Sequence, residues 1–159
     1  MTIYFVSGHM NIRADEFREH YVPVLNAVVN EQKDATFKLG NATGVDTLAL
    51  HHLLKELNVP SERIEVYVYN YYPNKQASEI ERLKRLSVTV CSGFENVHER
   101  DAALTRDSNC DILWIRSAAE NIARFGARYK VGHVSGTEKN KIRRQNRKIV
   151  KDAKKAKFV

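Results

Sequence analysis

Residues 37–49 are Phe-Lys-Leu-Gly-Asn-Ala-Thr-Gly-Val-Asp-Thr-Leu-Ala. A short apolar run ends at Gly40, a second glycine follows at Gly44, and the next residues have the composition of a helix. This order predicts a strand, a tight turn and the start of a helix. Glycines let backbone N–H groups approach a ligand closely, and a helix N-terminus carries partial positive charge. The turn therefore suits a phosphate or another anion.

Asp46 leaves two interpretations of this turn open. Its position just before the apolar helix residues is typical of an N-cap, and its carboxylate would then bind the backbone and not a ligand. In the other interpretation the turn cradles an anion, so that Gly44→Val fills the cradle and leaves the fold largely intact. Glycine is common in turns between strands and helices, so the stretch alone does not separate the two.

Length and composition favour a single globular domain. The chain has 159 residues, of which 43% are hydrophobic and 28% charged, and a chain of this length can bury a proper core. No apolar run is long enough to span a bilayer, and the N-terminus lacks the features of a secretory signal. Cys91 and Cys110 have no metal-ligand spacing and are predicted to be buried thiols in a reducing, cytoplasmic compartment. We expect no metal and no cofactor.

The formal net charge of +7 is concentrated at the C-terminal end. From residue 138 onward ten Lys/Arg face two acidic residues, a net charge of +8, so the rest of the chain is close to neutral. Such an end is either a solvated, fraying helix or a surface that attracts the phosphate backbone of a nucleic acid. We divide the chain into a single domain, residues 1–145, and a basic helical tail, residues 146–159.

Strand-like and helix-like segments alternate along the chain. Strands are predicted at residues 3–6, 36–39, 64–69, 88–91 and 112–115, and helices at 15–31, 46–57, 79–86, 95–107 and 138–156. Pro23 is expected to bend or break the first helix, Trp114 lies within the last predicted strand, and residues 118–134 suggest a mobile insertion or a hairpin. The alternation predicts an α/β fold, a Rossmann-like open parallel sheet of about five strands with helices on both faces.

Right-handed crossovers place every strand-to-helix turn at one edge of such a sheet, and ligands bind there, where the strand order reverses. The candidate ligand- and phosphate-binding residues at this edge are Ser7, Gly8, His9, Gly40, Asn41, Ala42, Thr43, Gly44, Asp46, Arg100, Ser135, Gly136 and Thr137. Their convergence predicts a site for a phosphate-bearing small molecule. The aromatic pair Tyr71 and Tyr72 either stacks on a planar base or covers the edge of the core.

The decapeptide at residues 40–49 resembles the Gly-x-Ala-x-Gly-hydrophobic-Asp-x-x-Ala signature of the SLOG superfamily. This superfamily includes DprA-like DNA-processing proteins, YspA-like proteins and LOG-type cytokinin-nucleotide phosphoribohydrolases. Three shorter stretches agree with it, namely Ser7-Gly8-His9, Glu99-Arg100-Asp101 and Ser135-Gly136-Thr137, so that the similarity spans about residues 3–145. It implies a Rossmann-like fold, frequent homodimers, and binding of nucleotides, nucleotide-derived signals or, in DprA-like members, single-stranded DNA.

Three functions follow as hypotheses. The first is binding of a nucleotide-like small molecule without turnover. The second is hydrolysis of the N-glycosidic bond of a nucleoside 5′-monophosphate, with Glu99 and Asp101 as candidate catalytic carboxylates; in the alternative these residues form surface ion pairs. LOG enzymes carry their catalytic glutamate where this chain has Asn140. The third is binding of single-stranded nucleic acid through the basic tail.

Overall fold

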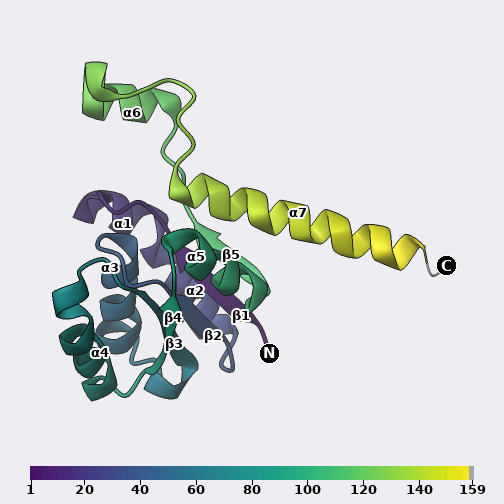
Figure 1. The fold of residues 1–159 in the computed structure, drawn as a ribbon. Coiled ribbons are helices and arrows are strands. Elements are labelled where there is room, and N and C mark those ends of the chain that lie inside the picture. The colour runs from purple at the N-terminus through teal and green to yellow at the C-terminus, as the bar shows by residue number, and fades with distance from the viewer. Residues whose placement is uncertain (158–159) are drawn as a thin grey trace.

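The computed structural model describes residues 1–157, and the last two residues of the predicted tail lie outside this range. Its centre is one sheet of five parallel strands in the order β4-β3-β2-β1-β5 (Figure 1). The strands are β1 (Ile3–Ser7), β2 (Thr36–Leu39), β3 (Ile64–Tyr69), β4 (Thr89–Phe94) and β5 (Cys110–Leu113). The helices are α1 (Ala14–His20), α2 (Val22–Glu31), α3 (Val45–His51), α4 (Gln76–Arg85), α5 (Val97–Arg106), α6 (Ala118–Phe125) and α7 (Gly136–Ala156). The predicted Rossmann-like α/β fold is confirmed.

The strand order reverses between β1 and β5. Strands β1 to β4 are added one after another in a single direction, and the chain then returns to place β5 on the free side of β1. In open parallel sheets, this reversal leaves a crevice beyond the carboxyl ends of the two strands. The residues that follow β1 and β5 are therefore the ones that the fold exposes to a ligand.

Each face of the sheet has its own core, because successive side chains of a strand point to opposite faces. Val6 of β1 joins the larger cluster, which also contains Phe17, Leu25 and Leu53 from the helices that follow β1 and β2. Its neighbour Phe5 points to the other face and packs with Tyr67, Ala103 and Leu104. Helices α1 to α4 therefore cover one face, and α5, with α7 beside it, covers the other.

The first predicted helix is broken near Pro23, as expected, and the second is irregular in its C-terminal half. The segment around Pro23 is broken into α1 and α2 at Tyr21, with the proline in the first turn of α2, where its missing N–H costs nothing. The second predicted helix is α3 followed by a single π-helical stretch, His52–Glu56.

Three further predictions are corrected. Trp114 lies just after β5 and not within it. Cys110 is exposed and Cys91 only half-buried, so neither thiol is a core residue. Residues 118–134 are not a hairpin: they contain α6, which a capping box of Ser117 and Glu120 begins, and a 3-10 turn, Gly126–Arg128.

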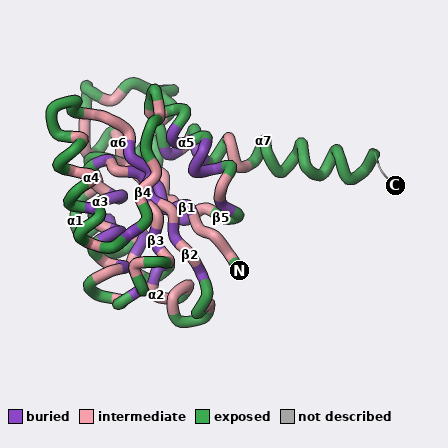
Figure 2. The backbone as a smooth tube through the Cα atoms, turned by 60° about the horizontal axis from the view of Figure 1, so that its bottom comes forward, coloured by how far each residue is buried: buried purple, intermediate pink, exposed green. Residues whose placement is uncertain are grey.

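Helix α7 begins against α5 and β5 and then leaves the body of the molecule, as both views show (Figures 1 and 2). Thr137 and Asn140 in its first turns are buried, whereas every residue from 145 to 157 is exposed. Within residues 1–157, no helix combines the length and apolarity needed to cross a lipid bilayer.

Candidate functional site

A cleft of about 390 Å³ lies at the carboxyl edge of the sheet, where β1 ends and helices α5 and α7 begin. Ten of the candidate residues line it: Ser7, Gly8, His9, Ala42, Asp46, Arg100, Asp101, Ser135, Gly136 and Thr137. They come from four segments that are far apart in the sequence, so the fold assembles the site. Gly40 and Asn41 line a neighbouring pocket on the other side of their turn, and Thr43 a third pocket.

Ser7 contributes a buried hydroxyl without a partner. The residue is 5% exposed, and its Oγ makes no hydrogen bond within residues 1–157. Its backbone carbonyl is occupied, because it accepts a hydrogen bond of 2.8 Å from the Tyr21 hydroxyl. Buried polar atoms are almost always paired in native proteins. The unpaired Oγ belongs to a lining residue of the cleft, and a hydrogen bond to a ligand bound there would satisfy it.

Two helix N-termini meet at this cleft. Asn96 caps α5 by accepting from the Glu99 N–H, and Ser135 caps α7 by accepting from the Glu138 N–H. The first two backbone N–H groups of each helix have no intrahelical acceptor. These groups belong to lining residues of the cleft, Val97 and His98 in α5 and Gly136 and Thr137 in α7. Two sets of N–H donors and two helix dipoles together favour an anion.

The structure places Glu99 and Glu138 in capping roles. The Glu99 carboxylate accepts from the Glu95 N–H at 2.7 Å, and Glu99 is not among the residues that line the cleft. The Glu138 carboxylate accepts from the Ser135 N–H at 2.9 Å, which completes a capping box. Both carboxylates hold the helix N-termini in shape.

Arg100 joins three segments of the wall. Its Nε and Nη2 atoms donate to Asp101 Oδ1 at 3.0 and 2.8 Å, and its Nη1 donates to Asn41 Oδ1 and to the Tyr71 hydroxyl, both at 3.0 Å. Four of the five N–H donors of this guanidinium are thus satisfied by protein. Arg100 is a positioning group with one donor left for a ligand.

Gly40 permits this arrangement. A Cβ atom at position 40 would lie 2.5 Å from Asp46 Oδ2 and 2.8 Å from the Arg100 guanidinium carbon. Any other residue would push the carboxylate and the guanidinium apart. The glycine therefore serves close packing of these two side chains.

Asp46 is not an N-cap, because Gly44 holds that position. Its Oδ2 still binds the backbone, accepting from the Ala42 N–H at 3.0 Å. Burial raises the pKa of this carboxyl group to about 6, although Arg100 and the Ala42 N–H lower it. Asp46 therefore titrates near neutral pH within the cleft wall.

The expectation that Gly44→Val would leave the fold intact is wrong. Gly44 has φ +82°, and a Cβ there would lie 2.4 Å from the His9 carbonyl oxygen and 2.5 Å from that of Met10. The glycine packs directly on the segment that follows β1. A larger residue would displace this segment instead of filling an open cradle.

Asp101 and His9 add the polar chemistry of the cleft. Asp101 holds Arg100 through Oδ1, and within residues 1–157 its Oδ2 makes no hydrogen bond. His9 Nε2 accepts from the Arg116 N–H at 3.0 Å, which places the ring proton on Nδ1. Burial, with the positive charge of Arg116, lowers the pKa of His9, so this ring is neutral at pH 7.

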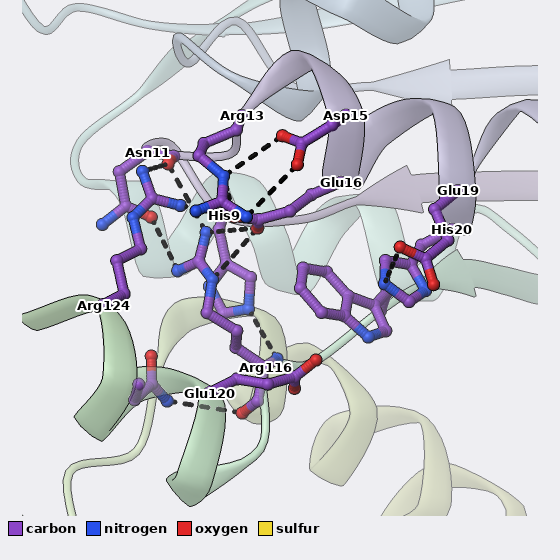
Figure 3. Close-up of polar contacts among 12 residues, drawn as sticks. His9, Asn11, Arg13, Asp15, Glu16, Glu19, His20, Arg116, Glu120 and Arg124 are labelled. Atoms are coloured by element: carbon purple, nitrogen blue, oxygen red, sulfur yellow. Dashed lines mark hydrogen bonds and ion pairs between the residues drawn. The ribbon is translucent and has the colours of Figure 1, made fainter.

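The network around Glu16 was not predicted from sequence patterns (Figure 3). This carboxylate, 9% exposed, binds Arg116 at 2.7 Å and Arg124 at 2.7 Å, and Arg13 at 3.1 Å. Arg124 also donates to the Asn11 carbonyl oxygen. The network ties the segment that carries α6 to α1, across about a hundred residues of sequence.

Within residues 1–157, no group of three or more His, Cys, Asp or Glu side chains could hold a metal ion. Comparison with known proteins gave no match to a family model, to a curated protein or to a solved structure.

Proposed function

We propose that this protein binds a nucleotide or a nucleotide-derived small molecule in the cleft at the carboxyl edge of the sheet. The observation that carries the proposal is the buried, unpaired hydroxyl of Ser7, a residue that lines the same cleft as the N-termini of α5 and α7. A phosphate would accept from this hydroxyl and from the backbone N–H groups of the two helices.

Other lining residues of the cleft suit the nucleoside. Tyr71, which is half-buried, offers a ring beside Asp46 and Asp101, whose oxygens can accept hydrogen bonds from sugar hydroxyls. A few convergent polar groups beside apolar and aromatic surface are typical of small-molecule sites. The resemblance of residues 40–49 to the SLOG signature supports the same ligand class. We also propose that the chain belongs to that superfamily and that it forms a homodimer. Sedimentation measurements of the oligomeric state test the second point.

Calorimetric titration with the four common nucleoside 5′-monophosphates tests the binding proposal. Ser7→Ala removes one hydroxyl and should weaken binding by roughly five- to tenfold, the effect of about 1 kcal/mol. Ser92→Ala is the matched control, because Ser92 is exposed on β4 at the far edge of the sheet. Equal affinity of the S7A variant and the wild type would contradict the proposed phosphate position. Absence of binding by all four nucleotides, and by the larger ligands considered below, would refute the function.

Hydrolysis of the N-glycosidic bond is a second candidate, favoured by two carboxylates in the same cleft. Asp101 has a free Oδ2, and the pKa of Asp46 is about 6, which suits an acid or base near neutral pH. Chromatography of a nucleotide incubated with the protein would show free base and ribose 5-phosphate. We expect Asp101→Asn to abolish that release; unchanged release by this variant would exclude Asp101 as the catalytic group.

A further inference from the structure

A second cleft, of about 420 Å³, adjoins the first. The two share four lining residues, His9, Asn11, His133 and Ser135. They therefore meet along the border formed by the segment after β1 and the N-cap of α7. A ligand bound at this border can extend into both.

The second cleft is cationic and aromatic. Arg116, Arg128 and Lys130 line it together with the rings of Phe125 and Tyr129. Its one acidic lining residue is Glu138, whose carboxylate is occupied by the Ser135 N–H. Within residues 1–157, the charges of Arg128 and Lys130 have no carboxylate within 4.0 Å. Two cations that are free of protein partners face this space.

The wall of this second cleft is anchored. Arg116, 3% exposed in its side chain, is held by Glu16 and lies 5.6 Å from the centroid of the Phe125 ring. Arg124, in the last turn of α6, binds the same Glu16 (Figure 3). These contacts fix α6, and with it the start of the segment that carries Arg128, Tyr129 and Lys130. A buried ion pair and a cation–π contact therefore anchor one wall of the cleft, formed by Arg116 and Phe125.

The two clefts differ in a way that matches the two halves of one ligand. The first offers the carboxylates of Asp46 and Asp101 and the Tyr71 ring, with the N-cap of α7 at the border. The second offers unpaired cations and two rings beyond the border. Each volume lies near the lower end of the range of about 300–1,000 Å³ for ligand sites, so one cleft suits a mononucleotide and the pair suits a larger molecule.

We propose that the preferred ligand is a dinucleotide joined by a pyrophosphate. Its bridge lies at the border, next to Ser7 and the N-terminus of α7, and its second nucleoside lies in the cationic cleft against Phe125 and Tyr129. Arg128 and Lys130 pair with the second phosphate group of the bridge, which a mononucleotide lacks. This inference rests on the proposed function and assigns its substrate class.

The test compares a mononucleotide with its dinucleotide by calorimetry: AMP with diadenosine pyrophosphate, and GMP with diguanosine pyrophosphate. We expect one dinucleotide to bind the wild type at least roughly tenfold tighter than its mononucleotide. The double variant R128A/K130A should lose this gain and keep the mononucleotide affinity within about twofold. The matched control K151A/K154A removes two exposed cations from the far end of α7 and should keep the gain.

The outcomes separate this inference from the proposed function. Equal affinity for a mononucleotide and its dinucleotide in the wild type would overturn the dinucleotide proposal and leave nucleotide binding intact. A dinucleotide gain that survives in R128A/K130A would also overturn it, because the gain would then come from elsewhere. Binding of neither ligand class would refute the proposed function itself. Arg128 and Lys130 are exposed, so their removal leaves the fold in place for all three measurements.

Discussion

At the scale of single residues, the Asp46 carboxyl makes the stability of the protein depend on pH. Its pKa is about 6 in the folded state, raised from 3.8 by burial. Between these two values the folded state binds more protons than the unfolded state. The contribution is therefore fully present below pH 3.8 and is lost as the pH rises through about 6.

Asp46→Asn should remove this part of the pH dependence. The amide keeps an oxygen for the Ala42 N–H and has no charge to bury. A shift of about two pKa units corresponds to roughly 3 kcal/mol, so the free energy of unfolding of D46N should rise by up to this amount relative to wild type between pH 4 and 7. Urea unfolding at each pH measures it, with the exposed Asp152→Asn as control. Parallel profiles for wild type and D46N would contradict the burial argument.

The Tyr21 hydroxyl connects the two strands at the point of reversal. It donates to the Ser7 carbonyl oxygen at 2.8 Å and accepts from the Trp114 N–H at 3.0 Å, and the residue is fully buried. Tyr21→Phe would leave both backbone groups buried and unpaired, at a cost of about 1–3 kcal/mol in the free energy of unfolding. Tyr4→Phe is the control, because the Tyr4 hydroxyl bonds only the side chain of Gln32 in a half-buried place. An equal loss in both variants would show that the bridge has no special role.

At the scale of elements, Glu16 fastens the segment that carries α6 to the body of the molecule. Glu16→Gln removes the charge that balances three arginines, among them the buried Arg116. Loss of one partner of a buried ion pair costs about 3–5 kcal/mol. We expect a loss of this size in the free energy of unfolding, and faster tryptic cleavage after Arg128 and Lys130, located by mass spectrometry.

The control for this prediction is Glu19→Gln, one turn further along α1, whose carboxylate is 75% exposed. This variant should keep the tryptic pattern of the wild type. If Glu16→Gln left cleavage after Arg128 and Lys130 unchanged, the ion pairs of Glu16 would not be what holds α6. The cationic cleft would then lose its structural anchor.

These elements also show which features of the structure can be predicted from the sequence. Hydrophobic spacing and turn glycines located all five strands and predicted the parallel sheet, because both signals are local. The sequence missed α6, because this helix presents no buried residue and its segment is rich in arginine. It could not pair Glu16 with Arg116 or leave Ser7 unpaired, because both depend on which distant segments the fold brings together. That the candidate residues lie at the edge of the sheet could be predicted from the sequence. The roles of Glu99, Arg100 and Asp46 became clear only from the hydrogen bonds that the structure shows for them.

At the scale of the whole molecule, the basic helix α7 has two parts with different roles. Arg144 donates to Asp111, to Ser108 and to the Thr105 carbonyl oxygen, which Arg147 also binds. These two arginines fasten α7 to the C-terminal end of α5, where cations are favoured. Beyond Arg147, within residues 148–157, the lysines are exposed and their side chains make no hydrogen bond or ion pair. The cations that could meet a nucleic acid are thus separate from those that support the fold.

Truncation after Arg147 therefore tests the nucleic-acid hypothesis without disturbing the site. The five lysines removed carry no structural contact, so the melting temperature and the affinity for mononucleotides should match those of the full chain. If these lysines meet phosphates, the slope of log K against log salt for a single strand should become shallower by up to about 3.5, since each phosphate contact contributes about 0.7. Truncation after residue 140 would instead remove Arg144 and Arg147, which hold α7 to the body of the molecule. A loss of binding could then not be distinguished from a loss of the fold. If the slope did not change after truncation at Arg147, the lysines of the tail would not bind the phosphates of the strand. The nucleic-acid hypothesis would then fail, and the cleft at the sheet edge would remain the proposed site for a phosphate-bearing ligand.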